Sequence, residues 1–218
     1  MQFLLQSYNW DPSNSYSIPN LLLQHLITTG ISMGIGLVIA FPVALLIARY
    51  PRLYTPIITT SSVIYTLPSL AFMAFLIPYT GLSLPTVVIP LVLYAQIVLI
   101  RNIVAAIRAV DPTLVEVGRA MGMNWYQLQT RVVLPLALPI IVAGIRVATV
   151  TTIGIATIGG LFGVYNLGFL ITQGFNLAYP AETLAGVILT AALAIVADLS
   201  LLGVQRLLSR GQQLVAAV

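Results

Sequence analysis

The chain has 218 residues, of which 59% are hydrophobic and only 6% are charged. An average globular domain carries about 25% charged residues, so this composition excludes a soluble fold with an ordinary polar surface. The absence of cysteine excludes disulfides and thiolate metal sites. The net charge of +4 comes from arginines that flank apolar runs, which indicates a protein of the lipid bilayer and not one that binds nucleic acid.

The apolar sequence divides into five expected membrane spans. A helix crosses the hydrocarbon core in about 20 residues, and no charge occurs between Leu53 and Ile100, a run too long for one crossing. Pro78, Gly81 and Pro85 punctuate this run and predict a tight turn between two spans. The predicted fold class is an all-α integral membrane protein with one transmembrane domain, 1–218, and spans near 26–48, 57–77, 85–102, 138–162 and 183–204.

The basic residues, all of them arginine, predict the orientation in the membrane. Eight fall on one side of a five-span topology: Arg49, Arg52, Arg101, Arg108, Arg119, Arg131, Arg206 and Arg210. Because cytoplasmic loops are rich in basic residues, we expect the N-terminus outside and the C-terminus in the cytoplasm. Residues 1–20 lack the basic start and continuous apolar stretch of a signal peptide, and we expect them to form an extracytoplasmic or interfacial segment.

The segment 108–135, between the third and fourth spans, predicts a cytoplasmic helix–turn–helix. Asp111 is a good N-cap, and Gly122 is placed to end the first helix in a left-handed conformation. Asn124 begins a second helix, with Gln127 three residues on as in a capping box. Such a hairpin can dock into a groove of a partner protein. Its expected apolar anchors are Met121, Met123, Trp125 and Leu128.

This segment resembles the EAA loop of ABC importer permeases, whose pattern is E-A-A, three residues, G, nine residues, I, one residue, L-P. Here Glu116-Val117-Gly118 stands for E-A-A, Val132 replaces I, and Leu134-Pro135 lies in register at the expected re-entry into the membrane. In that family the loop seats in a separate ATPase, which binds ATP and Mg²⁺. The resemblance implies an ATPase-coupling role for Asp111, Glu116, Arg119, Ala120, Met121, Gly122, Met123, Trp125, Leu134 and Pro135.

A second resemblance covers most of residues 20–205 and is to the permeases of osmoprotectant importers, which carry glycine betaine, carnitine, choline or proline betaine. The motifs that carry it include Pro68-Ser-Leu-Ala, Leu91-Val-Leu-Tyr, Gly118-Arg-Ala-Met-Gly-Met, Ala143-Gly-Ile-Arg and Ile153-Gly-Ile-Ala-Thr-Ile. Gly163 and Leu167-Gly168 are similar to a Gly-x-x-x-Leu-Gly of that family. The resemblance implies a type I importer fold in the bacterial inner membrane. It also implies ATPase subunits, a second permease copy or paralogue, and a separate substrate-binding protein as partners.

Two charges fall within the expected spans, Arg146 in the fourth and Asp198 in the fifth. At 1.5 Å per residue each lies about 10–12 Å from the cytoplasmic side. A charge in the bilayer needs a partner or a wet cavity, so we predict an ion pair that ties these consecutive spans together. Two alternatives stay open: Arg146 reaches the cytoplasmic interface while Asp198 bonds to backbone or water, or Arg146 pairs with Glu116 or Asp111.

Aromatic, glycine and proline residues within the spans allow two interpretations. The tyrosines either line a cationic pathway or anchor the protein at the interface. The glycines and prolines either permit close helix packing or bend helices around a pathway. The expected pathway residues are Tyr65, Pro68, Tyr94, Thr152 and Thr157.

No catalytic site is expected in this chain. His25, the one histidine, reads as a solvated or interfacial residue and not as a metal ligand, and no Walker sequence is present to bind ATP. We therefore expect a transport subunit without enzyme activity or a cofactor of its own. Two other functions stay open: a permease for another polar solute such as an amino acid, and a membrane scaffold or enzyme with no transport role.

Overall fold

The computed structural model describes residues 2–216, with side chains described for residues 3–209, so the side chain of Arg210 lies outside the described residues. The long helices are α2 Ile18–Arg49, α5 Leu84–Arg108, α8 Leu134–Ala156 and α10 Pro180–Ala216. The shorter helices are α1 Gln2–Leu5, α3 Tyr54–Thr66, α4 Ser69–Thr80, α6 Pro112–Ala120, α7 Trp125–Leu128 and α9 Leu167–Asn176. Three 3₁₀ turns, η1 Ser7–Trp10, η2 Pro51–Leu53 and η4 Thr157–Leu161, and one π turn, η3 Gln129–Val133, complete the secondary structure.

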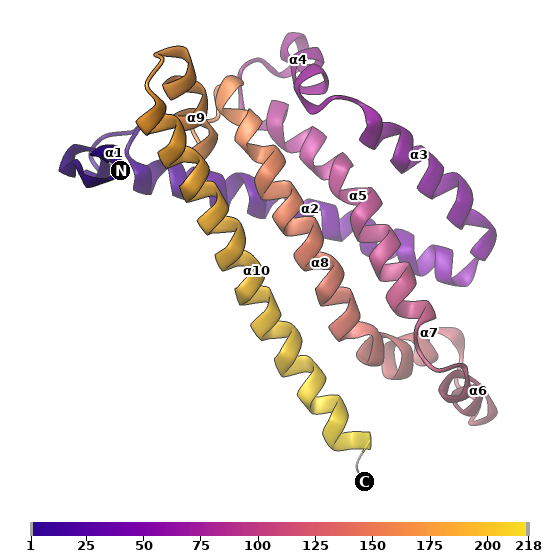
Figure 1. Ribbon diagram of the computed structural model, residues 1–218. Helices are drawn as coiled ribbons and strands as arrows, with labels where there is room; N and C mark the ends of the chain where they lie inside the picture. The colour runs from indigo at the N-terminus through magenta and orange to yellow at the C-terminus, as the bar shows by residue number, and fades with distance from the viewer. Residues whose placement is uncertain (1, 217–218) are drawn as a thin grey trace.

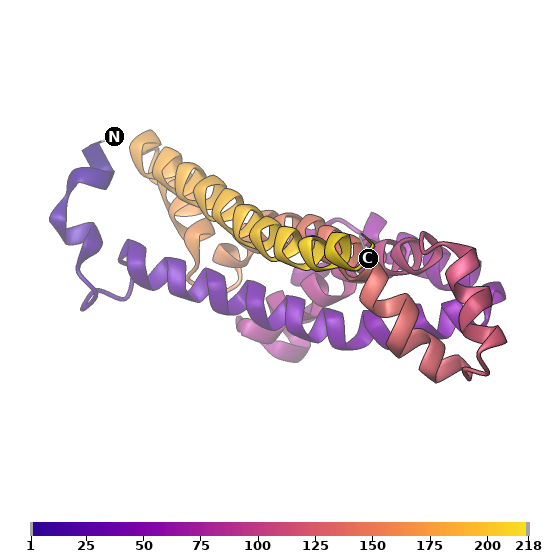
Figure 2. The ribbon, with the colours of Figure 1, turned by 90° about the horizontal axis from the view of Figure 1, so that it is seen from below.

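The long helices form a single bundle. Helices α5, α8 and α10 lie side by side, and α2 crosses behind them (Figure 1). The N-terminal segment, α4 and α9 lie toward one end of the bundle, whereas α6, α7 and the C-terminus lie toward the other (Figures 1 and 2). Within the described residues, four helices are long and apolar enough to cross a membrane, and the bent pair of α3 and α4 adds a fifth span if counted as one. The predicted all-α fold with about five spans is confirmed.

Helix α5 is the centre of the bundle. Its residues Leu99, Ile103 and Ala106 are buried against small and branched residues of α2 and α8. Two glycines permit these contacts, since a methyl group on Gly36 would press on Leu99 and one on Gly144 would overlap Asn102. Close packing therefore explains these two glycines. By contrast, Gly30, Gly34 and Gly154 face open space on the surface of the chain.

The expected second span, 57–77, is not one straight helix. Helices α3 and α4 meet at an angle of 88°. Leu67 precedes a proline and adopts an extended conformation, with φ −64° and ψ 130°, because the proline ring disfavours the helical region for the preceding residue. The hydroxyl of Tyr94 on α5 donates to the freed carbonyl of Leu67 at 2.9 Å. The break is thus stabilised by the neighbouring helix, as backbone at membrane depth requires.

The fourth span begins earlier than the sequence predicts. The second helix of the hairpin, α7, does not end before the expected re-entry at Pro135. It continues through the π turn into α8, so the helix runs from Trp125 to Leu161. In the π turn the amide of Leu134 donates to the carbonyl of Gln129, five residues back. A π turn inside a helix accommodates the following proline without a break. The hairpin is therefore rigidly attached to a membrane span.

At its far end α8 tightens into η4, and two side chains take up the carbonyls that this change releases. His25 on α2 is fully buried, and its Nε2 lies 3.1 Å from the carbonyl of Ile153. Asn166 donates to the carbonyl of Ala156 at 2.7 Å, and its side-chain oxygen caps α9 by accepting from the amide of Gly168 at 2.9 Å. The expectation of a solvated or interfacial His25 is therefore wrong: the residue joins α2 to α8.

Candidate functional site

The hairpin formed by α6 and α7 has the caps that the sequence predicts. Asp111 accepts a hydrogen bond from the amide of Thr113 at 2.8 Å, and this bond lowers the pKa of the Asp111 carboxyl below its usual range. At the other end of α6, Gly122 has φ +81°. The amide of Gly122 donates to Arg119 at 2.9 Å and that of Met123 to Gly118 at 3.1 Å, which is the Schellman arrangement. Glycine adopts this left-handed conformation without strain.

The second helix is capped reciprocally. The side chain of Asn124 accepts from the amide of Gln127 at 2.9 Å, and the side chain of Gln127 accepts from the amide of Asn124 at 2.9 Å. Both orphan donors of this helix start are thereby satisfied. A glycine at 118 lets the two helices meet, because a methyl group there would lie 2.7 Å from Leu128. The hairpin is consequently a preformed, well-defined object.

The apolar surface of the hairpin differs from the predicted set of anchors. Leu128 is 3% exposed and packs in the core, and Met123 is half-buried against the same cluster. Of the expected anchors, only Met121 is freely exposed, at 72%. The exposed apolar face is instead made by Leu114 and Val117 on α6, Met121 at the C-cap of α6, and Tyr126 on α7. The spacing of 114, 117 and 121 is that of one helix face, a signal in the sequence that the prediction of anchors overlooked.

Arginines at the ends of two long helices contact aromatic rings at this end of the bundle: Arg49 reaches the hairpin, whereas Arg108 joins α5 to α3. The guanidinium of Arg49, the last residue of α2, lies 5.2 Å from the ring centroid of Trp125, which is half-buried beneath it. Similarly, Arg108 at the end of α5 lies 4.7 Å from the ring of Tyr54. Such contacts attract through the ring quadrupole. Trp125 therefore faces α2 and contributes little to the exposed face.

The other predicted coupling residues divide between the two surfaces. Glu116, Arg119 and Ala120 are exposed on α6. Leu134 is half-buried and packs on the core, and Pro135 is exposed at the start of α8. Arg146 does not pair with Glu116 or Asp111 of this loop, because its guanidinium binds Asp198.

Arg146 on α8 and Asp198 on α10 meet inside the bundle. The Nε and NH2 groups of the guanidinium donate to the two carboxylate oxygens at 2.9 and 2.8 Å. The NH1 group donates to the side-chain oxygen of Gln205 at 2.8 Å. Gln205 follows Asp198 on α10 and was not among the residues expected from the sequence. All three residues thus form one network between two neighbouring helices, with bidentate geometry on the charged pair.

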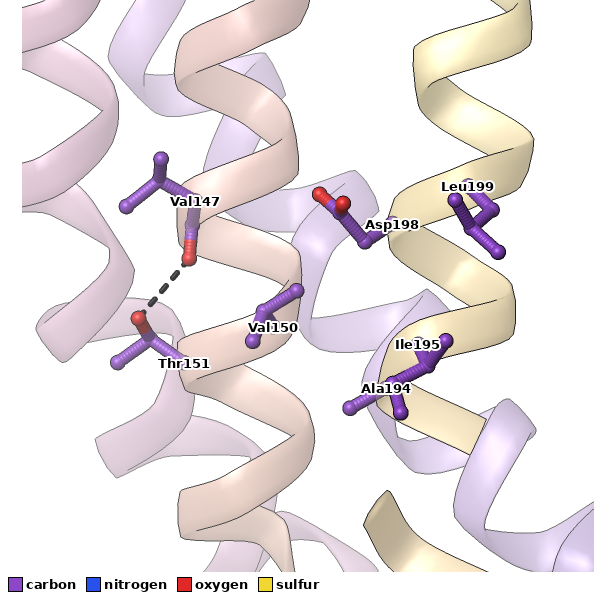
Figure 3. A pocket seen from close by; sticks show the side chains of 7 residues that line it. All are labelled: Val147, Val150, Thr151, Ala194, Ile195, Asp198 and Leu199. Atoms are coloured by element: carbon purple, nitrogen blue, oxygen red, sulfur yellow. Dashed lines mark hydrogen bonds between the residues drawn. The ribbon is translucent and has the colours of Figure 1, made fainter. Parts of the chain in front are cut away.

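A shallow groove of about 430 Å³ runs between α8 and α10 beside this network. Figure 3 shows its lining: Val147, Val150 and Thr151 come from α8, and Ala194, Ile195, Asp198 and Leu199 come from α10. The hydroxyl of Thr151 donates a hydrogen bond to the carbonyl of Val147 on its own helix at 2.9 Å. The lining is otherwise apolar, so the Asp198 carboxylate is the one charged group that borders the groove.

The expected pathway residues do not form one group. Tyr65 and Tyr94 are edge-to-face with ring centroids 5.7 Å apart, and both lie at the α3–α4 break with Pro68. Thr152 is buried on α8, where its hydroxyl donates to the carbonyl of Ala148 at 2.8 Å. Thr157 donates to the carbonyl of Gly154 at the start of η4. Tyr65, Pro68 and Tyr94 therefore lie together at the α3–α4 break, whereas the two threonines lie in and just after the last turns of α8.

Residues 32–213 match a protein family described as binding-protein-dependent transport system inner membrane component. The chain belongs to this family. As an inner membrane component of a transport system, it is a permease subunit and not an enzyme. The match includes the hairpin, the broken α3–α4 pair and the Arg146 network.

Similar permeases of known name extend over nearly the whole chain. A carnitine transport permease of Listeria monocytogenes is 38% identical over 210 residues, covering 96% of this chain and 94% of its own. A choline transport system permease of Bacillus subtilis is 36% identical, covering 96% and 93%. Among solved structures, the inward-facing MetNI methionine ABC transporter matches with a TM-score of 0.76 and 22% identity, covering 88% of this chain and 95% of that one. The latter likeness shows the permease fold.

Proposed function

We propose that this chain is the membrane permease of an ATP-driven importer that passes an osmoprotectant, such as glycine betaine, carnitine or choline, into the cytoplasm. The observation that carries the proposal is the similarity along 96% of the chain to carnitine and choline transport permeases. The motifs at Pro68, Gly118 and Ile153 that resemble osmoprotectant permeases lie within this region.

The hairpin supports a role in coupling to a separate ATPase that binds ATP and Mg²⁺. Its exposed face presents Leu114, Val117 and Met121 around a backbone that is capped at both ends. Apolar side chains on one helix face are the usual anchors for docking into a groove. Because α7 continues into α8, a displacement of the hairpin by the ATPase moves a membrane span directly.

The orientation follows from the arginines. The hairpin end of the bundle carries Arg49, Arg108, Arg119 and Arg131, whereas no arginine occurs in residues 1–48 or 147–205. Basic residues mark the cytoplasmic side, so the N-terminal segment, α4 and α9 face outward, where a separate substrate-binding protein delivers the solute.

A functional transporter contains two permease copies, like or related. Alternating access requires two halves that move against each other, and one chain forms only one such half. Gly30, Gly34 and Gly154 face open space on this chain, and small residues on a free helix surface permit close approach of a second membrane helix.

Uptake by the reconstituted transporter tests this proposal. The permease, its ATPase and its binding protein are placed in liposomes, and ATP-dependent uptake of radiolabelled glycine betaine, carnitine and choline is measured. We expect uptake of at least one of them, absent without ATP or without the permease. Uptake of amino acids alone, or ATP-independent uptake, would refute the proposal.

A further inference from the structure

A polar pocket of about 440 Å³ lies at the outer end of the bundle, away from the hairpin and the ion pair. The N-terminal segment lies near α9 and the start of α10 (Figures 1 and 2). Residues of these three segments line the pocket. Its lining combines aromatic rings, including Tyr8, Tyr16 and Phe169, with the single carboxylate of Glu182. This pocket has no part in the coupling described above.

Glu182 is an acidic group with no partner. It is only 6% exposed, in the first turn of α10, yet among the described residues nothing donates a hydrogen bond to its carboxylate or pairs with it. No basic residue occurs in residues 1–17 or 157–205, which supply all the walls of the pocket. The Glu182 side chain is largely buried, but its oxygens are not fully enclosed and remain open to the pocket. A carboxylate in such a place without a partner is costly, and the helix N-terminus compensates only part of the charge. A cation in the pocket would satisfy it.

The rings beside Glu182 are arranged as a cluster. Tyr16 stacks on Phe169 with centroids 5.2 Å apart, and Tyr165 meets both rings edge-on at 5.0 and 5.1 Å. The N-terminal segment brings Tyr8 to the same pocket. Faces of aromatic rings attract quaternary ammonium groups, which need no hydrogen-bond acceptor. Rings together with one carboxylate therefore select an organic cation.

The same pocket disfavours a solute that carries its own carboxylate. The amide group of Asn9 already donates to the carbonyl of Phe3 at 2.7 Å and to Gln6 at 3.3 Å. Asn14 accepts from the amide of Tyr16 at 3.0 Å. Asn14 and Gln173 therefore keep amide donors that could face a solute, but none of the residues that line the pocket is basic, so no side chain there balances a second anion beside Glu182.

The geometry points to an outer cation site that holds a choline-type quaternary ammonium between the Glu182 carboxylate and the rings of Tyr8, Tyr16 and Phe169. It takes the monovalent cation in preference to the zwitterions glycine betaine and carnitine. The inference rests on the proposed function for the class of solute, and it adds a site and a rank order within that class.

Equilibrium binding of radiolabelled choline to the full-length permease in nanodiscs tests the site. We expect unlabelled tetramethylammonium to displace choline. Glycine betaine should displace choline at least about tenfold less well, a difference of about 1.4 kcal/mol in binding free energy. Glu182→Gln should weaken binding about tenfold or more, and Tyr16→Leu severalfold. Asp11→Asn, which changes an exposed carboxylate of the same segment outside the pocket lining, should leave binding unchanged.

Three results would overturn the inference: equal choline binding by wild type and Glu182→Gln, equal displacement by glycine betaine, or no choline binding by wild type. If Glu182→Gln keeps choline binding but loses stimulation of ATP hydrolysis by the binding protein, the pocket is a protein contact instead. Should that variant fail to fold in size-exclusion chromatography, Tyr16→Leu and Phe169→Leu decide. If ATP-driven uptake is normal alongside any of these results, the cation site is wrong but the proposed transport function stands. Failure of the site can therefore be told apart from failure of the proposed function.

Discussion

Arg146 on α8 and Asp198 on α10, 52 residues apart in the chain, are joined by two parallel hydrogen bonds. The side chains of Arg146 and Asp198 are 20% and 35% exposed, so the ion pair is partly buried. A single unpaired charge within a membrane span costs several kcal/mol, so each of these charges stabilises the other. The pair thus joins α10, which packs along one edge of the bundle, to the hairpin-bearing α8.

The first prediction concerns this pair. Arg146→Ala and Asp198→Ala should each lower the yield of folded permease, because each leaves the other charge unpaired, and the double variant should be no worse than the worse single one. Gln205→Ala removes a neutral partner and should have a smaller effect. Yield is measured by fluorescence-detected size-exclusion chromatography. Additive losses in the double variant would show that the two charges do not act as a pair.

The second prediction concerns His25. Its replacement by alanine leaves the buried carbonyl of Ile153 without a donor, which should cost about 1–3 kcal/mol in the free energy of unfolding. His25→Gln retains a donor and should recover part of that loss. Thermal unfolding in detergent provides the measurement, with Leu26→Ala, at a residue 48% exposed on the same helix, as the control. Equal midpoints for wild type and His25→Ala would contradict the structural role.

The third prediction concerns Gly122 and its φ of +81°. A left-handed conformation costs a non-glycine residue about 1–2 kcal/mol, and a β-branched one more. Gly122→Val should therefore reach the membrane but distort the turn, so that ATP hydrolysis no longer drives uptake. Gly203→Val adds the same atoms on α10, where open space surrounds the glycine, and should transport normally. Uptake by Gly122→Val at the wild-type rate would show that this turn is not needed for coupling.

The fourth prediction concerns orientation and exploits the absence of cysteine from the chain. Tyr8 and Met121, at opposite ends of the bundle, are 69% and 72% exposed. In intact spheroplasts, a membrane-impermeant maleimide should label Tyr8→Cys directly. Met121→Cys should be labelled only after the membrane is opened. The reverse pattern would invert the proposed topology.

Much of this architecture could be predicted from the sequence, because the bilayer leaves few choices. The number of spans, the cap at Asp111, the left-handed Gly122 and the Asn124–Gln127 box all depend on local signals that tertiary contacts do not overrule. The proximity of Arg146 and Asp198 follows from matched depth in consecutive helices.

What the sequence did not reveal depends on contacts between distant segments. Pro68 causes the break at Leu67, but the partner of the freed carbonyl is the Tyr94 hydroxyl, 27 residues away. In the same way, His25 is buried beside the carbonyl of Ile153 on another helix. Helix α9 was missed because the segment is short; its signals were the N-cap at Asn166 and a glycine at 168, where a methyl group would overlap Thr157. The inward turn of Leu128 likewise depends on the close approach of α6 at Gly118.

Docking of the exposed hairpin face on a separate ATPase, as proposed above, can be tested by cross-linking. Met121→Cys in the otherwise cysteine-free permease is labelled with a benzophenone maleimide, and the purified permease–ATPase complex is irradiated. The account predicts a covalent permease–ATPase product from Met121→Cys and none from Tyr79→Cys, which is 75% exposed on α4 at the opposite end. Cross-linking of the ATPase through Tyr79→Cys, with none through Met121→Cys, would contradict it.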